Sequence, residues 1–213
     1  MLIAIDGLAG SGKTSTSKLL AKEIGLRYLD TGAMYRALTY HIIDQGISAN
    51  NEKLISKLLP SISMKVKYFD DGINIICNNR NLTSFLRDDI VSNNVSNISA
   101  IKGCRNLMVS IQRDIVGKKG YVVEGRDIGT VVFPDADFKF FLKADLKERA
   151  MRRFSQLDSK SDIDYLEKNI KYRDEYDSSR DISPLSISKD AIIIDTTQMT
   201  LKQQVKKIIR LIK

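Results

Sequence analysis

The chain has 213 residues, of which 43% are hydrophobic and 28% are charged, and its formal net charge is +8. This length suits one well-buried α/β core with a small insertion, and the composition is ordinary for a globular protein. No apolar run approaches the roughly 20 residues that span a bilayer, and no basic segment precedes the first apolar run, so we expect neither a membrane span nor a signal peptide. The two cysteines, Cys77 and Cys104, match no metal spacing, which is typical of reduced thiols in a cytoplasmic protein.

The excess of basic residues fits either a nucleic acid or small polyanions as partners. The sequence has no basic low-complexity tail and no basic stretch interleaved with aromatic residues. Several arginines instead stand singly in separate short motifs. This arrangement favours one phosphate site over a long anionic track, so we expect no nucleic acid partner.

The beginning of the chain combines an apolar strand at residues 2–5, a glycine-rich turn and a helical pattern at residues 13–24. Its turn fits the phosphate-loop motif G-x-x-x-x-G-K-[ST], in which glycines let backbone N–H groups point into a concave loop. The helix adds its positive N-terminal end. Lys13 would place a cation on the β/γ-phosphates, and the Thr14 hydroxyl would bind Mg²⁺, partly through water. The residues expected to hold ATP and Mg²⁺ are Gly7, Leu8, Ala9, Gly10, Ser11, Gly12, Lys13, Thr14 and Ser15.

The rest of the chain alternates between strands and helices. A helix from about Ala33 is expected to have Asp30 or Thr31 as its N-cap, and the helical stretch 85–117 is expected to break near Gly103. The other strands are expected at residues 28–29, 121–123, 138–142 and 191–194, and the other helices at 33–44, 51–59, 145–157, 162–178 and 200–212.

One segment departs from this alternation. Residues 62–68 and 73–77 flank Asp70-Asp71-Gly72, which predicts a β-hairpin, and residues 78–80 predict a second turn. We therefore expect a small β insertion at about residues 62–83.

The alternation predicts an α/β fold with a parallel sheet covered by helices on both faces, as in P-loop NTPases. Ligands of such sheets bind beyond the carboxyl ends of the strands. The phosphate loop, residues 30–32, residues 125–127 and Asp195 all follow predicted strands. They are therefore expected to share one edge of the sheet.

Several arginines lie near this edge. Phosphoryl transfer needs charge neutralised on a donor and on an acceptor, and Arg36, Arg126, Arg173 and Arg180 each adjoin a polar or glycine-bearing segment or a helix leading to the edge. Arg173, Asp177 and Arg180 stand at i, i+4 and i+7, so they share one helix face. Their spacing alone fits an exposed salt-bridge ladder equally well.

A second basic group precedes a polar stretch. Arg149, Arg152 and Arg153 come shortly before residues 158–161, as in a mobile flap that closes over a transferring phosphoryl group and excludes water. An ordinary charged helix end has the same pattern, and spacing does not decide between the two.

Over nearly its whole length the chain resembles the bacterial cytidylate kinases, which belong to the nucleoside monophosphate kinase group. The resemblance rests on the phosphate loop, on Leu29-Asp30-Thr31-Gly32-Ala33-Met34-Tyr35-Arg36 and above all on residues 123–136, VEGRDIGTVVFPDA. Arg173-Asp174, Asp177, Arg180 and Pro184-Leu185 complete it.

This resemblance implies transfer of the ATP γ-phosphoryl group to CMP or dCMP, with Mg²⁺. It implies catalytic roles for Lys13, Arg126, Arg149 and Arg153. The residues implied to bind the acceptor phosphate are Arg36, Arg126 and Arg180. Those implied to read the cytosine are Ser96, Arg105 and Asp127. Tyr35 and Thr31 are implied beside the acceptor nucleotide, and Arg173 and Asp177 at its sugar.

The resemblance also implies one domain over residues 1–213. Its expected parts are a core of residues 1–30, 84–150 and 180–213, an acceptor region of about 31–83 that contains the β insertion, and a lid of about 150–165. The chain departs from the family at Leu8, where Pro is usual, at Thr14, where Gly often follows the lysine, and at Glu124, where many relatives have Asp. A cytoplasmic monomer without membrane contact is expected.

Three other functions fit parts of the pattern. A regulatory P-loop NTPase would hydrolyse nucleotide without an acceptor. A basic nucleic-acid module would bind DNA or RNA with a steep salt dependence. A small-metabolite kinase of the shikimate or gluconate type would lack the set Ser96, Arg105 and Asp127.

Overall fold

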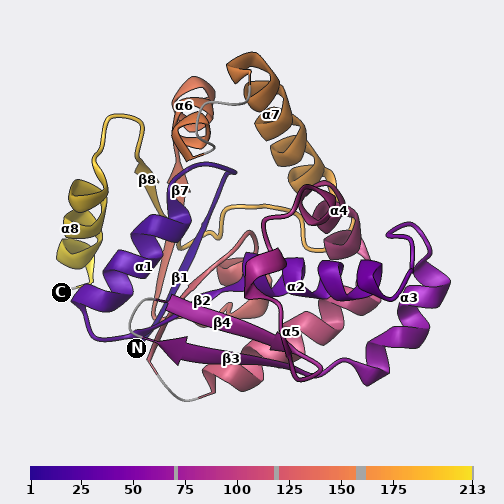
Figure 1. Ribbon diagram of the computed structural model, residues 1–213. Coiled ribbons are helices and arrows are strands. Elements are labelled where there is room, and N and C mark those ends of the chain that lie inside the picture. The colour runs from indigo at the N-terminus through magenta and orange to yellow at the C-terminus, as the bar shows by residue number, and fades with distance from the viewer. Residues whose placement is uncertain (70–71, 118–119, 157–161, 213) are drawn as a thin grey trace. The chain divides into compact units, whose positions relative to one another are not determined.

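The computed structural model describes residues 1–69, 72–117, 120–156 and 162–212. Its contacts divide the chain into two compact units. We call Met1–Asp30 with Lys118–Lys213 the sheet unit, and Thr31–Gly117 the inserted unit. Figure 1 labels the elements of both.

The sheet unit is built on five parallel strands in the order β2-β6-β1-β7-β8. The central strand β1 is flanked on both sides, so that Ile3 stands opposite Val122 of β6 and Phe138 of β7. The inner strands β1 and β6 are apolar over residues 2–5 and 121–123, because both faces of the sheet are covered there. The strands are β1 (Leu2–Gly7), β2 (Arg27–Asp30), β6 (Tyr121–Glu124), β7 (Phe138–Lys143) and β8 (Ile192–Asp195).

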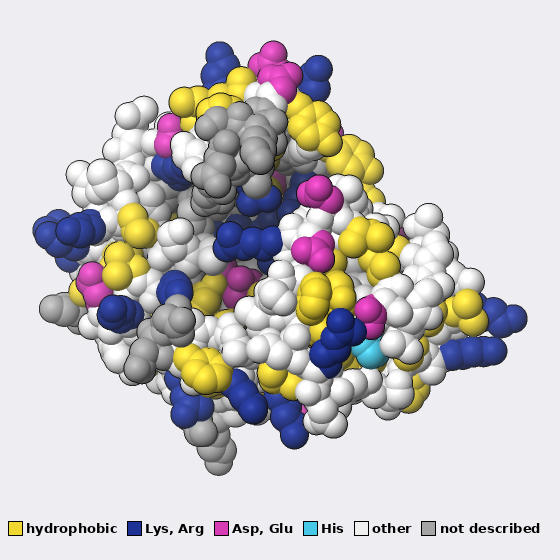
Figure 2. Space-filling view, in the orientation of Figure 1, with side chains coloured by type: hydrophobic (Ala, Val, Ile, Leu, Met, Phe, Trp, Pro, Cys, Tyr) yellow, Lys and Arg dark blue, Asp and Glu magenta, His cyan; other side chains and the backbone are white. Residues whose placement is uncertain are grey.

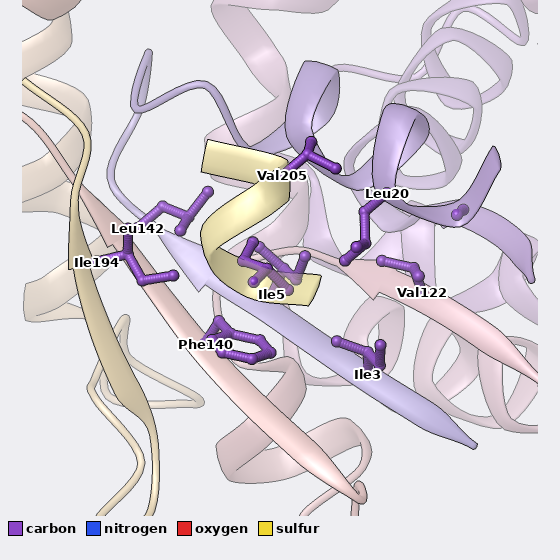
Figure 3. Packing of buried hydrophobic residues seen from close by; sticks show 10 residues of the cluster. Ile3, Ile5, Leu20, Val122, Phe140, Leu142, Ile194 and Val205 are labelled. Atoms are coloured by element: carbon purple, nitrogen blue, oxygen red, sulfur yellow. The ribbon is translucent and has the colours of Figure 1, made fainter. Parts of the chain in front are cut away.

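The helices of the sheet unit are α1 (Lys13–Glu23), α6 (Leu146–Gln156), α7 (Ile163–Ser179) and α8 (Leu201–Leu211), with a π-helical turn η3 (Ile128–Val132). Helix α1 packs against α8, and α6 packs against α7. Figure 3 shows Leu20 of α1 and Val205 of α8 packed with Ile5 and Phe140 of the strands. This core fixes α1 and α8 on the sheet and confirms the predicted parallel sheet flanked by helices. None of the described helices combines the length and the apolar character that a bilayer-spanning helix needs.

The inserted unit contains the predicted hairpin. Strands β3 (Met64–Phe69) and β4 (Gly72–Cys77) pair antiparallel, and residues 70–71 of the predicted turn lie outside the described residues. Asn78 and Asn79 have φ of 45° and 65°, as a two-residue hairpin turn requires, and they lead into β5. The remaining elements are β5 (Arg80–Asn81), α2 (Thr31–Asp44), α3 (Glu52–Leu58), α4 (Asp89–Ala100) and α5 (Lys102–Val116), with 3₁₀ turns η1 (Leu59–Ser61) and η2 (Thr83–Phe85).

Two predicted boundaries were confirmed approximately, and each lies two residues from its expected position. Helix α2 begins at Thr31 rather than Ala33, because β2 runs directly into the helix at Asp30. The break between α4 and α5 lies at Ile101, whose φ of −69° and ψ of 123° are extended, and not at Gly103. Gly103 lies inside α5, where a Cβ would come within 2.9 Å of Leu59 Cδ1, so the glycine permits close packing instead of breaking the helix.

The unit boundary also differs from the expected division. Residues 84–117 were expected to belong to the core, but they group with the inserted unit. Packing explains this: α4 packs on α2, while α5 packs on η1 and β3.

Candidate active site

The loop between β1 and α1 has the backbone that its glycines predict. Gly10 and Gly12 have φ of 74° and 89°, in the left-handed region that favours glycine. A Cβ on Gly7 would lie 2.1 Å from the backbone oxygen of Leu142, so β7 approaches too closely for any side chain there. Within the described part of the chain, the Ser11 hydroxyl is buried without a hydrogen-bond partner. An oxygen atom of a ligand bound in the loop would supply that partner.

Lys13 lies across this loop. Its Nζ donates to the Leu8 carbonyl at 2.7 Å, and its side chain is buried. Burial lowers the pKa of Lys13, and the positive charge of Arg126 lowers it further, against the opposing effects of Glu124 and Asp174. A bound polyanion would favour the charged form, because it would supply the negative charge that this cation lacks.

Glu124 and Thr14 provide oxygen ligands beside the loop. Thr14 Oγ1 donates to Glu124 Oε2 at 3.1 Å, and the Tyr28 hydroxyl donates to Glu124 Oε1. Burial raises the pKa of Glu124, and so does the nearby carboxylate of Asp30, which faces Glu124 across the β2–β6 pair. A hydroxyl and a carboxylate are the donors that Mg²⁺ prefers, so these residues fit the ion that the motif implies.

Asp6 holds the turn that follows β6. Its carboxylate accepts from the backbone N–H groups of Ile128 and Gly129, both at 2.8 Å. Burial nevertheless raises the pKa of Asp6 to about 6, and the backbone hydrogen bonds offset only part of that effect. The side chain therefore favours the protonated form more in the folded than in the unfolded chain.

This raised pKa predicts a pH dependence. The stability that Asp6 contributes is present below its unfolded pKa of 3.8 and is lost as the pH rises through about 6. Relative to Asp6→Asn, the free energy of unfolding of the wild type should fall by about 2.4 kcal/mol between pH 4 and pH 7. Urea unfolding of both proteins across this range measures the difference, and a difference that stays constant contradicts the prediction.

Arg126, at the carboxyl end of β6, pairs with helix α7. Its Nε donates to Asp177 Oδ2 at 2.8 Å, and Arg180 Nη1 lies 3.7 Å from Asp177 Oδ1. Burial raises the pKa of Asp177, but Arg126, Arg180 and Arg173 more than offset it, so the net shift is downward. The Asp177 and Arg180 side chains are buried, which excludes the alternative of an exposed salt-bridge ladder. Asp127, which follows Arg126 in the chain, is also buried.

The arginines of α6 differ in their surroundings. Arg149 is buried: it donates to the carbonyls of Ala9 and Ala144, at 2.9 and 3.0 Å, and to Asp174 Oδ2. Asp174 also accepts from the Ala9 N–H at 2.8 Å, so this pair supports the phosphate loop instead of extending from a flap. Arg153 is exposed on the same helix. Residues 158–161 of the expected flap lie outside the described residues.

Two of the five predicted site residues of the inserted unit are in contact. Arg105 of α5 is buried, with its guanidinium carbon 5.7 Å from the centroid of the Tyr35 ring and Nη1 3.3 Å from the Ser99 carbonyl. The Ser99 hydroxyl donates to the backbone carbonyl of Ser96 at 2.9 Å, within helix α4. Thr31 is buried in the first turn of α2, the helix of Tyr35, and Arg36 is half-buried on that helix.

Some residues that contact the phosphate loop and Glu124 lie far from them along the chain and were not predicted. Tyr28 reaches Glu124 from the neighbouring strand, and Thr196 and Gln204 contact the phosphate loop and the first turn of α1. The only sequence feature that placed any of these residues near the site was the position of Thr196 directly after Asp195 at the end of β8. Figure 2 shows Lys and Arg side chains at separate places on the viewed face.

Comparison with known proteins gives one consistent family. The family model described as "Cytidylate kinase" matches residues 3–213. Proteins named cytidylate kinase include those of Clostridium tetani, 47% identical over 100% of this chain and 93% of that protein, and Clostridioides difficile, 43% identical over 98% and 96%. The protein of Carboxydothermus hydrogenoformans is 41% identical over 100% of this chain and 97% of its own length.

Solved structures agree on the fold. A shikimate kinase from Acinetobacter baumannii, in complex with shikimate, has a TM-score of 0.50 at 14% identity, covering 99% of this chain and 92% of that one. At this identity the likeness shows the shared kinase fold alone.

Proposed function

The chain belongs to the cytidylate kinase family, and from this premise we propose how its residues transfer the γ-phosphoryl group of ATP to CMP. We propose that dCMP is a second acceptor and that ATP binds with Mg²⁺. One observation carries the assignment of residues: the sheet unit holds both a phosphate loop and a separate pair of arginines at the buried Asp177 carboxylate, the half-buried Arg126 and the buried side chain of Arg180. A donor and an acceptor phosphate each need such positive charge.

The donor half is the loop of residues 7–15. Its backbone N–H groups and Lys13 would hold the ATP phosphates, and Thr14, with Glu124 behind it, would hold Mg²⁺. The ion, when bound, neutralises charge on the phosphate oxygens. The Thr14–Glu124 hydrogen bond and the buried Ser11 hydroxyl support this assignment.

We propose that Arg126 and Arg180, with Arg36, bind the acceptor phosphate, and that Arg173 and Asp177 bind the sugar. The Arg126–Asp177 pair supports this, because the carboxylate holds the guanidinium in place before any ligand binds.

The cytosine site follows from hydrogen-bond complementarity. Cytosine offers an amino donor beside the N3 and O2 acceptors. A carboxylate at Asp127 would accept from the amine, while Arg105 and Ser96 would donate to the acceptors. Uracil would place O4 against that carboxylate, which is costly when both are buried. Tyr35 would pack beside the base, with Thr31 near it, and the contact of Tyr35 with Arg105 supports that place.

Catalysis in this arrangement is positioning and electrostatic stabilisation. The acceptor phosphate is largely dianionic near neutral pH, since its second pKa is about 6, so it attacks in line without a general base. Lys13 and Arg126 stabilise negative charge on the transferring group, and we propose Arg153 as the arginine of α6 that joins them on closure. Arg149 supports the loop instead, because its guanidinium is bound to Ala9, Ala144 and Asp174.

A coupled assay of ADP formation tests the proposal. ATP is supplied with CMP, dCMP, UMP, AMP or no acceptor, and CMP and dCMP should raise turnover far above the rate without acceptor. Equal ATP hydrolysis in every reaction would favour the regulatory NTPase, and turnover with none of the nucleotides would favour a small-metabolite kinase. We further propose that the enzyme acts as a cytoplasmic monomer without a nucleic acid or membrane partner; its two free, buried cysteines suit a reducing compartment.

The role of Asp127 gives a sharper prediction. Asp127→Ala should weaken CMP binding by roughly 2–3 kcal/mol, because the cytosine amine loses its buried acceptor, while ATP binding stays nearly unchanged. Titration calorimetry with CMP and with ADP measures both affinities. Asp135→Ala, which removes an exposed carboxylate nearby in the sequence, is the control and should change neither. An equal loss of ADP affinity would contradict the placement of Asp127 at the acceptor.

A further inference from the structure

The carbonyl of Ser11 in the phosphate loop is held from the other end of the chain. Thr196, directly after β8, is fully buried, and its Oγ1 lies 3.1 Å from the Ser11 carbonyl and 3.1 Å from the Lys143 carbonyl. The hydroxyl therefore has two carbonyl acceptors at equal distance, and the Lys143 carbonyl also accepts from the Thr196 N–H at 2.8 Å, whereas Ser11 receives the hydroxyl alone from Thr196. Arg152 donates to Thr196 Oγ1 at 3.1 Å and to the Thr196 carbonyl at 2.6 Å, so this hydroxyl cannot turn freely.

A second contact holds the first turn of α1. Thr16 Oγ1 donates to Gln204 Oε1 at 2.6 Å, and Gln204 Nε2 donates to the Met199 carbonyl at 3.0 Å, which fixes the orientation of the amide. The same Oε1 would lie 3.3 Å from a Cβ built on Gly12. The neighbour of Gln204, Val205, is anchored in the core shown in Figure 3, so α8 presents the amide from a rigid position.

These contacts determine where the loop amides point. A peptide unit is planar, and in its trans form the C=O and the following N–H point in opposite directions. Holding the Ser11 carbonyl toward Thr196 therefore turns the Gly12 N–H away from Thr196. Gly12 has a φ of 89° and lacks a Cβ, so its backbone has the freedom to rotate if that contact is removed.

We propose that Thr196 and Gln204 form a loop clamp: two positioning residues that fix the amide directions of the phosphate loop for the donor nucleotide. They act through Ser11 and Thr16 and not by touching the phosphates. The inference rests on the proposed function only in that the donor is taken to bind at this loop. We expect loss of the clamp to weaken the binding of ATP and ADP and to leave the binding of CMP unchanged, because loop amides that point in the wrong direction bind phosphate more weakly.

The test uses isosteric variants of the full chain. Thr196→Val removes the hydroxyl and keeps the shape, and we expect ADP to bind at least tenfold more weakly by calorimetry and KM for ATP to rise in parallel. KM for CMP should change less than twofold. Thr196→Ser, which keeps the hydroxyl, should restore the ADP affinity to within about twofold of the wild type. Gln204→Met should act in the same direction, and adding Thr16→Val to it should cause little further change, because both variants remove the same hydrogen bond.

Loss of stability alone has a different signature. Ile208→Val removes one methylene from the same helix and should lower the melting temperature without changing ADP affinity. If Thr196→Val does not fold, Gln204→Met decides the question. The proposal is overturned if these variants bind ADP as the wild type does, or if KM for CMP rises as much as KM for ATP. If the wild type bound ADP but phosphorylated no nucleotide, the proposed function would fail, while ADP affinity would still test the clamp.

Discussion

Replacing Lys13 by Met is expected to lower kcat by at least roughly 100-fold at saturating ATP and CMP, the scale of losing one preorganised electrostatic contact to a transition state. Lys13 is buried across the phosphate loop, where its ammonium group donates to the Leu8 carbonyl. In the proposed complex the ammonium group of Lys13 contacts the β- and γ-phosphates. It stabilises the negative charge that develops on the leaving group during transfer.

The same substitution should leave the folded state intact. Burial and Arg126 lower the pKa of Lys13, so keeping this lysine charged near neutral pH costs folding free energy. We therefore expect Lys13→Met to show no loss in urea unfolding, although it loses turnover. Lys22→Met, an exposed lysine later in the same helix, is the matched control and should keep full activity. An unchanged kcat in Lys13→Met would contradict the place of this lysine on the phosphates.

The positive charge around the loop exists before any ligand binds. Burial lowers the pKa of the Arg126 guanidinium, but Asp177, Asp174 and Glu124 together raise it by more, so the net shift is upward. Arg126 in turn lowers the pKa of Lys13, because the two cations repel each other. Their mutual repulsion is relieved when phosphate groups arrive. Holding the two cations close together costs folding free energy, but it preorganises the site for electrostatic catalysis.

Local sequence patterns predicted most of the fold for a clear physical reason. Apolar runs such as residues 121–123 report burial on both faces, and the glycines at 7, 10 and 12 report backbone conformations that other residues avoid. The pattern placed the break between α4 and α5 near Gly103 instead of at Ile101, because a glycine that permits close packing on Leu59 has the same local signature as one that breaks a helix. Steric fit between distant elements is absent from any short window of sequence.

The residues of the candidate site were predicted unevenly for the same reason. The loop, Arg126 and the face of α7 were visible because each belongs to a short motif. The contacts of Tyr28 with Glu124 and of Gln204 with Thr16 join residues 96 and 188 positions apart, and no periodicity reports them. Arg149 is the instructive case, since its neighbours in sequence suggested a flap, whereas its partners in space are Ala9 and Asp174.

Arg149→Met is expected to lower the free energy of unfolding by roughly 3 kcal/mol, because it leaves the Asp174 carboxylate buried without its cation. The Arg149 side chain is only 7% exposed and that of Asp174 12%, so water replaces the lost partner poorly. A lid arginine would behave in the opposite way, with full stability and a reduced kcat. Arg153→Met, an exposed arginine one turn later, is the matched control: its unfolding free energy should change by less than about 0.5 kcal/mol, and its effect should fall on kcat.

A double variant separates the charge from the packing. Asp174→Asn keeps an oxygen that accepts from the Ala9 N–H and removes the negative charge, so adding it to Arg149→Met should recover part of the lost stability. Two independent losses would instead add. Urea unfolding of the wild type, both single variants and the double variant measures this coupling. Strict additivity of the two losses would show that the guanidinium acts through its carbonyl contacts alone. A stable Arg149→Met protein with reduced kcat would instead favour a role of Arg149 in the lid.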